Sequence, residues 1–328
     1  MDNQIISPIE PAAPDDSRKR IGIEATRSLL RVAVIGEQEA DVIQSSTIKL
    51  VASELLLPQL ARVISELKQQ INAGTIGIAV SGLVERASNR IALSKQLPEV
   101  ADFDFAAELS NQCQTAIYLE NDANAAAYGE FTMGAGSGAH SMFFATIGAG
   151  IGGALILDGK LWRGANGFAG EFGHIAINED GTKLEDVASA ANIIRRTRER
   201  LFHDSTSSLS PRVLEQITTI DDIVAAAQNG DDFAQMMLER TGIYVGTAIS
   251  SVINLLNVER VVLGGEVMEV ERVILQSIIR RARERSFLPS FEATQIVAAE
   301  LGANAAAIGA ALLAGREQER KTEKNVGK

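Results

Sequence analysis

Cysteine is almost absent from this 328-residue chain, in which Cys113 is the only one. A single cysteine excludes an internal disulfide framework and leaves no Cys-x-x-Cys pair for a metal, so we expect a reducing, cytoplasmic setting. The chain also lacks a run of about 18 apolar residues, and its polar N-terminus has no apolar signal segment. We therefore expect neither export nor a membrane partner.

Positive charge is in deficit as well. The chain has 31 Lys and Arg against 42 Asp and Glu, for a net charge of -11. Because nucleic-acid surfaces need clustered Lys and Arg, we expect no nucleic-acid partner. Hydrophobic residues at 46% and charged residues at 22% are ordinary for a globular protein. The length leaves room for two domains.

The first half of the chain reads as strands followed by a helix. Short apolar, β-branched segments between residues 20 and 50 predict an antiparallel meander. An amphipathic helix is expected within 51–74, ending at Gly74, and "TIGIAVSG" reads as a buried strand. This order of β and α segments indicates an α/β layer.

A second round of the same pattern follows residue 122. "SMFFATIGAG" and "GGALILDGK" read as two strands joined by a Gly-rich turn, and 189–257 is mainly helical. A strand at 259–266, a helix at 270–286, an extended segment at 294–301 and an Ala-rich last helix complete the chain. Because strand, Gly turn and strand recur near 21–36 and 143–159, we expect two similar α/β domains with a cleft between them.

These patterns also predict domain limits. The expected parts are a Pro-rich flexible leader at 1–19, an N-terminal α/β domain at 20–122 joined by the C-terminal helix at 302–315, a C-terminal α/β domain at 123–301, and a charged, frayed tail at 316–328.

Two clusters of polar residues are candidates for chemistry. Asn121 and Asp122 stand where an apolar strand ends and an Ala-rich helix begins, which suits either simple helix capping or a ligand contact at a strand end. In "GEFGH", Glu171 and His174 lie among closely spaced glycines, and Glu185 follows shortly after. A loop this rich in glycine is costly to order, which favours a site over mere surface.

Two glycine turns have open interpretations. "GAGIGG" at 148–153 is either a hairpin that links two strands or a cradle of backbone amides for phosphate. A dinucleotide-binding interpretation fails, because a strand and not a helix follows the turn. "VVLGGE" at 261–266 is either a turn or a place where a flat ring approaches the backbone.

Taken together, "ENDANAAAYGE", "TIGAGIGGALILDGK", "GANGFAGEFGH", "VVLGGE" and "LGANAAAIGAALLAG" resemble the ROK family (repressors, open reading frames and sugar kinases) from about Arg20 to Gly315. The resemblance implies an actin-like ATPase (ribonuclease-H-like) fold of two α/β domains around a cleft. It implies Asp122 as catalytic base, and sugar contacts from Asn121, Glu171, His174 and Glu185. It also implies nucleotide contacts from Glu24, Ser28, Gly148, Gly150, Gly152, Gly153, Gly264 and Gly265.

Three departures from the family pattern stand out. The zinc-binding Cys-rich segment is absent, so we expect no zinc, and His174 must be oriented by another partner. Gln96 stands where the family often has Asn, which bears on sugar choice. In the first phosphate loop, Thr26 and Arg27 replace two glycines, so the usual cradle is reshaped, and Arg27 is placed to reach phosphates directly.

We therefore expect an ATP- and Mg²⁺-dependent kinase that phosphorylates a hexose, glucose first, at its 6-hydroxyl. Asp122, with an ordinary pKa of about 3.9, would be ionised and ready to accept the hydroxyl proton. The alternative is a sugar-binding protein that has lost its nucleotide affinity at "EATRS". A repressor is not favoured, because the residues before the first strand are too few for a helix-turn-helix. A homodimer is implied by the resemblance alone.

Overall fold

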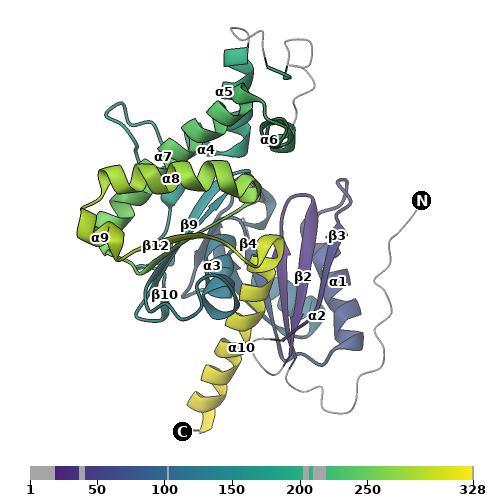
Figure 1. The fold of residues 1–328 in the computed structure, drawn as a ribbon. Helices are drawn as coiled ribbons and strands as arrows, with labels where there is room; N and C mark the ends of the chain where they lie inside the picture. The colour runs from purple at the N-terminus through teal and green to yellow at the C-terminus, as the bar shows by residue number, and fades with distance from the viewer. Residues whose placement is uncertain (1–18, 37–40, 102, 202–206, 210–218, 327–328) are drawn as a thin grey trace. The chain divides into compact units, whose positions relative to one another are not determined.

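The computed structural model describes residues 19–36, 41–101, 103–201, 207–209 and 219–326 (Figure 1). Apart from Lys19, the leader expected at 1–19 lies outside the described residues. The chain divides into two compact units. The first unit comprises residues 1–133, 163–168 and 304–328, and the second comprises residues 134–162 and 169–303.

A five-stranded sheet forms the first unit, with strand order β3-β2-β1-β4-β7. Its strands are β1 (Arg20–Ala25), β2 (Leu29–Ile35), β3 (Val42–Lys49), β4 (Thr75–Val80) and β7 (Ala116–Asn121). The first three strands are antiparallel, which confirms the predicted meander, and β4 and β7 run parallel to β1. A separate two-stranded sheet consists of β5 (Leu83–Glu85) and β6 (Arg90–Leu93).

Alternation along the strands sends large apolar side chains to one face of this sheet. Ile21 and Ile23 of β1 and Ile76 and Ile78 of β4 are all fully buried there. Helices α1 (Leu56–Gln70) and α2 (Phe105–Cys113) cover this face and complete its hydrophobic core. The amphipathic pattern predicted within 51–74 is therefore the α1 helix, with Leu60, Ile64 and Leu67 turned inward.

The opposite face of the sheet carries small residues and packs on α3 (Asp122–Met133) and α10 (Ala305–Val326). A Cβ atom at Gly22 of β1 would overlap the carbonyl oxygen of Ala307 in α10. Gly309 of α10 is as close to Ala125 of α3. These close approaches hold α3, and with it Asp122, against the sheet.

Helix α10 corrects one expectation. The charged segment 316–328 was expected to be a frayed tail, but α10 continues to Val326. Two of its acidic residues form ion pairs with the first unit: Glu317 with Arg86 at 2.6 Å and Glu319 with Arg20 at 2.9 Å.

The second unit repeats the topology of the first. Its sheet order is β10-β9-β8-β11-β12, with three antiparallel strands followed by two parallel ones. The strands are β8 (Met142–Ile147), β9 (Ile151–Leu157), β10 (Lys160–Trp162), β11 (Arg260–Gly264) and β12 (Gln295–Ala298). Each unit therefore starts with a meander and adds parallel strands beside the meander's first strand.

Helices cover one face of the second sheet. They are α4 (Glu185–Ala188), α5 (Ala190–Leu201), α6 (Ile220–Gln228), α7 (Asp232–Leu256), α8 (Glu271–Arg285) and α9 (Leu288–Glu292). Helices α7 and α8 lie side by side in Figure 1, and Gly242 and Gly246 of α7 allow the close contact. The core beneath them contains Phe143, Ile147 and Phe172.

The compact units and the predicted domain limits differ mainly at two places. The predicted boundary follows Asp122, whereas α3 and the short segment Arg163–Phe168 group with the first unit. Contacts of α3 with α10 account for the first of these assignments. Among the helices of the described ranges, none is both long and apolar enough to cross a membrane.

Candidate active site

Asp122 lies at the carboxyl edge of the first sheet. Because β1, β4 and β7 are parallel, their C-terminal ends meet at one edge, where Ala25, Val80 and Asn121 are in register. Asp122 follows β7 directly and is the first residue of α3. Such an edge is where open α/β sheets bind ligands.

Asn121 is the cap of helix α3. Its Oδ1 accepts from the amide of Asn124 at 2.9 Å, and its Nδ2 donates to Gly82 O and to Asp122 Oδ1. The capping interpretation is therefore right for Asn121. Its side-chain amide thus already donates to Gly82 and to Asp122, and its role as a sugar contact stays a prediction.

The Asp122 carboxyl group has an unusual environment. Its partial burial, followed by the nearby charge of Glu24, raises its pKa from the ordinary value to about 7. Hydrogen bonds from the Ala123 amide, its own backbone amide and the Ser81 hydroxyl act in the opposite direction. The expectation of an ordinary pKa near 3.9 is therefore wrong, because sequence alone could not show this burial or the second carboxylate.

Glu24 and its partner Arg31 stand beside Asp122. Arg31, directly opposite on β2, donates from Nη1 to Glu24 Oε2 at 2.7 Å. Burial raises the pKa of Glu24, and the charge and hydrogen bond of Arg31 oppose that shift. Only one carboxylate oxygen of Glu24 is used in this pair, and the other faces no partner among the described residues.

The turn from β1 to β2, where two glycines were expected, is closed by a side chain instead. The Thr26 hydroxyl donates to Leu29 O at 2.9 Å and accepts from Leu29 N at 3.2 Å, so a side chain closes the turn. Neither Thr26 nor Arg27 adopts a positive φ. The turn therefore has a backbone conformation that residues other than glycine can adopt. Arg27 and Ser28 are exposed at its tip.

Glu120, which the sequence analysis missed, holds the turn between β7 and α3 that carries Asp122. Its side chain is only 3% exposed, and it accepts from Arg163 Nε at 2.8 Å and Nη2 at 2.6 Å. The Tyr118 hydroxyl and the amide of Asn121 also donate to it. A carboxylate one residue before a polar motif gives little signal, because its partner Arg163 is remote in sequence.

In the second unit, "GAGIGG" forms the hairpin that joins β8 to β9. Ile147 pairs with Ile151, so the loop is 148–150, and the Gly148 amide donates to Gly150 O at 2.9 Å. The Ile151 amide donates to Glu185 Oε2 at 2.9 Å. In the described part of the chain, the amides of Ala149 and Gly150 have no partner. The hairpin interpretation is thus right, and two amides stay available for an anion.

The glycine-rich loop lies next to this hairpin. A Cβ at Gly153 would come within 2.7 Å of Gly170 O, and one at Gly173 would reach 3.3 Å from Glu185 Oε2. Glu185 therefore contacts both the hairpin and the loop that carries Glu171 and His174. Glu171 is exposed, and its side chain makes no hydrogen bond or ion pair with the described residues.

Lys183, also missed by the sequence analysis, partners His174. Its ammonium nitrogen lies 3.3 Å from His174 Nδ1. An ammonium group can only donate, so this contact requires Nδ1 of His174 to be the acceptor and leaves Nε2 to carry the ring hydrogen. Because the chain lacks the zinc-binding segment, His174 needs another partner to orient its ring, and Lys183 is placed to be that partner.

Several of the glycines that were predicted to contact the nucleotide stand where close packing leaves no room for a side chain. Gly265 has φ +94, and a Cβ there would collide with the backbone of Ile147. Gly264 is buried at the end of β11, where a Cβ would lie 3.1 Å from Ala299 Cβ. Gly152 is partly exposed on β9, opposite Thr146. Ligand contacts at Gly152, Gly153, Gly264 and Gly265 stay predictions.

One carboxylate oxygen of Glu24 is open to a divalent ion such as Mg²⁺. Within the described ranges, no three His, Cys, Asp or Glu side chains lie close enough together to hold a metal ion. Mg²⁺ typically takes only one or two carboxylates and completes its shell with water and phosphate oxygens. Glu24 is able to provide that share.

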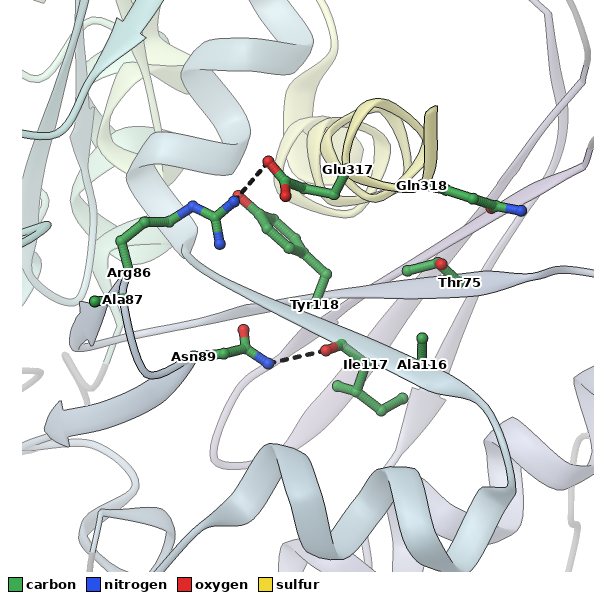
Figure 2. Close-up of a pocket in the computed structure, with 9 residues that line it drawn as sticks. All are labelled: Thr75, Arg86, Ala87, Asn89, Ala116, Ile117, Tyr118, Glu317 and Gln318. Carbon is green, nitrogen blue, oxygen red and sulfur yellow. Dashed lines mark hydrogen bonds and ion pairs between the residues drawn. The ribbon is translucent and has the colours of Figure 1, made fainter. Parts of the chain in front are cut away.

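A polar hollow lies at the other end of β4 and β7, lined by Thr75, Arg86, Ala87, Asn89, Ala116, Ile117, Tyr118, Glu317 and Gln318 (Figure 2). The Arg86 guanidinium pairs with Glu317 and lies 4.7 Å from the centre of the Tyr118 ring. Asn89 Nδ2 donates to Ile117 O at 2.9 Å. The charged side chains that line the hollow, Arg86 and Glu317, are thus already paired with each other.

Two units with the same five-stranded order define the actin-like ATPase fold, in agreement with the solved structures that the chain resembles. The match to the model described as "ROK family" covers residues 20–317, and the chain belongs to this family.

Three similar proteins show the range of the family. A glucokinase of Halalkalibacterium halodurans is 31% identical over 259 residues, covering 76% of this chain and 78% of the relative. A xylose repressor of Bacillus spizizenii is 28% identical over 234 residues, covering 71% of this chain and 59% of the repressor. The crystal structure of a ROK family glucokinase from Streptomyces griseus, in complex with glucose and AMPPNP, has a TM-score of 0.79 at 24% identity, covering 91% of this chain and 99% of that one.

Proposed function

We propose that this protein phosphorylates a hexose, glucose in the first place, at its 6-hydroxyl with ATP as donor and Asp122 as general base. The observation that carries the proposal is Asp122 itself: a carboxyl group at the ligand-binding edge of the sheet whose pKa is raised to about 7. A base is most effective when its pKa is near the working pH. The glucokinase relatives support the class of reaction.

The sugar is held by residues that accept and donate hydrogen bonds. Glu171 and Glu185 offer carboxylate oxygens, and His174 offers the Nε2 proton that its contact with Lys183 leaves in place. Asn121 completes the set from the cap of α3. A hexose presents hydroxyls that both donate and accept, so this mixture suits it.

Asp122 acts when it is ionised. It accepts the proton of the sugar hydroxyl as the hydroxyl oxygen forms its bond to phosphorus, and the bond between phosphorus and the leaving nucleotide oxygen breaks. ATP would supply the phosphoryl group, and Mg²⁺ held through Glu24 would neutralise part of its charge. The amides of Ala149 and Gly150 would contact phosphate. Glu24 and Ser28 would face the metal and the phosphates. The nucleotide side of the site would be shaped by glycines: Gly148, Gly152, Gly153, Gly264 and Gly265.

A coupled ADP-release assay tests this function directly. Purified protein is given ATP and Mg²⁺ with a panel of hexoses and N-acylated hexosamines. We expect turnover with at least one hexose, glucose being the fastest. Sugar binding by calorimetry without ADP release from any sugar would reject the kinase and support the alternative below.

The alternative is a sugar-binding regulator without nucleotide affinity. Two observations favour it: Arg31 already pairs with Glu24, and the first turn is closed by Thr26 instead of glycine. The similarity to a xylose repressor has the same implication. Titration with AMPPNP separates the two functions, since the regulator would show no heat of nucleotide binding even with sugar present.

The pH profile of kcat/KM should follow Asp122. Because the base must be ionised, we expect activity to rise about tenfold per pH unit below pH 7 and to level off above it, with an apparent pKa near 7. Replacing Glu24 by Gln removes a like charge, so the acid limb should move to lower pH. A wild-type limb near pH 4 would contradict the raised pKa.

We also propose that the protein is a homodimer with no nucleic-acid partner and acts in the cytoplasm. The first of these properties is checked by light scattering on a size-exclusion column, where the dimer would show twice the mass of one chain. A single-chain mass at micromolar concentration would reject it.

A further inference from the structure

The segment Arg163–Phe168, here called the strap, is attached to the first unit although the chain on both sides of it belongs to the second. At one end Arg163 pairs with Glu120. Near the other end Gly167, with φ +105, lies so close to Val84 O that a Cβ would overlap it. From there the chain continues directly to Glu171 and His174.

Glu120 connects the strap to the turn that carries Asp122. Its Oε2 accepts the two hydrogen bonds from Arg163 and one from the Tyr118 hydroxyl at 3.1 Å. Its Oε1 accepts from the Asn121 amide and from Asn124 Nδ2, both at 3.1 Å. Asp122 stands between these last two residues, so one buried carboxylate fixes both the strap and the turn.

Tyr118 keeps Glu120 in place from the side of the polar hollow. Figure 2 shows the Tyr118 ring close to the Arg86 guanidinium, which is itself paired with Glu317 of α10. Burial and the charge of Glu120 raise the pKa of Tyr118, so its hydroxyl stays a donor. Arg163 Nη2 also contacts the Tyr118 oxygen at 3.2 Å. The planar guanidinium of Arg163 fits this pair of oxygens in a way that a Lys ammonium cannot.

We propose that Arg163 is a positioning residue that couples the loop of Glu171 and His174 to the turn of Asp122. The proposal rests on the proposed function, because it assumes that this loop holds the sugar. Through Glu120, the fork of Arg163 fixes the starting point of the sugar loop and the backbone beside the catalytic carboxyl group at the same time. Loss of this link should therefore weaken sugar binding and slow the reaction without affecting the nucleotide.

Arg163→Met tests the link. With D-glucose as the probe, we expect the sugar Kd and KM to rise about tenfold or more and kcat to fall by up to about 10²-fold, since small displacements of reacting groups have effects of this size. The KM for ATP should stay within twofold. Arg20→Met is the matched control, because it breaks another ion pair of the first unit, that with Glu319, at a site remote from Glu120. It should leave all kinetic constants unchanged.

The double variant Arg163→Met/Glu120→Met separates positioning from charge neutralisation. It removes the unpaired buried carboxylate, so it should recover much of the melting temperature lost in Arg163→Met and serves as the folded test protein. We expect it to bind D-glucose as weakly as the single variant. A double variant with wild-type glucose affinity, or a folded Arg163→Met with a glucose Kd within twofold of wild type, would overturn the proposal.

Calorimetry distinguishes failure of this inference from failure of the proposed function. Glucose affinity is measured without ATP, so the strap is tested even if the wild-type protein releases no ADP. If the wild-type protein binds none of the sugars of the panel, the assignment of the loop to sugar fails, and the coupling role of Arg163 is overturned with it.

Discussion

Replacing Asp122 by Asn is expected to lower kcat by about 10² to 10⁴-fold, the usual value of general-base help, while sugar affinity stays within a few-fold. The amide has nearly the same shape, and its oxygen still accepts from the Ala123 amide as the carboxylate does at 2.9 Å. It cannot take a proton. The measurement is steady-state ADP release at pH 8, beside calorimetric binding of the sugar.

The same substitution is also expected to change the stability of the protein. Because the folded-state pKa of Asp122 is raised to about 7, its ionisation opposes folding: the free energy of unfolding falls as pH rises from about 4 to 7 and stays lowered above that. Asp122→Asn removes this loss, so its melting temperature at pH 8 should equal or exceed that of the wild type. A residue that lowers stability while it raises activity is typical of a functional site.

Asp104→Asn is the matched control for these measurements. Asp104 also stands at a helix N-terminus, where its Oδ1 accepts from the Ala107 amide at 3.2 Å, but it is exposed. It should change neither kcat nor the pH dependence of activity. If Asp122→Asn kept kcat within tenfold, the base would lie elsewhere. If it lost several degrees of melting temperature at pH 8, the carboxylate would be a structural cap.

Strands were predictable from the sequence wherever one face is apolar and the other small or polar. The segments that became β1 and β2 have this alternation, whereas β3, β8 and β9 were predicted from short runs of apolar and β-branched residues. The end of α10 was missed for the opposite reason, because residues 316–326 have no apolar period. They do consist largely of Glu, Gln, Lys and Arg, which favour helix, and neither Gly nor Pro interrupts them.

The candidate site was predictable only in part. Motifs placed Asp122 at the end of a strand, but its raised pKa depends first on burial and then on the charge of Glu24, which comes from another strand. The pair of Glu120 and Arg163 and the pair of His174 and Lys183 likewise join residues that no local pattern connects. Glycine patterns gave no means to separate ligand contacts from close packing, and Gly265 shows that packing alone is sufficient to require a glycine.

Gly309→Ala is expected to destabilise the protein by about 2 kcal/mol, as overpacking of a core does. Helix propensity alone predicts the opposite sign, a gain of about 1 kcal/mol, because Ala is the better helix former. Steric overlap outweighs helix propensity here, because a Cβ at Gly309 would collide with Ala125 O of α3 and lie 2.9 Å from Gly129 N. Neither backbone can yield without separating α10 from α3. Urea unfolding measures the difference.

Gly315→Ala in the same helix is the control that separates packing from propensity. There the three atoms nearest to the added Cβ all belong to the outer part of the Arg20 side chain, which can move aside, so the substitution should be neutral or stabilising. Equal effects at the two glycines would reject the packing argument. Because α3 begins at Asp122, its displacement in Gly309→Ala should also reduce kcat in the folded fraction. A loss of stability with unchanged kcat would mean that α3 moves without its first turn.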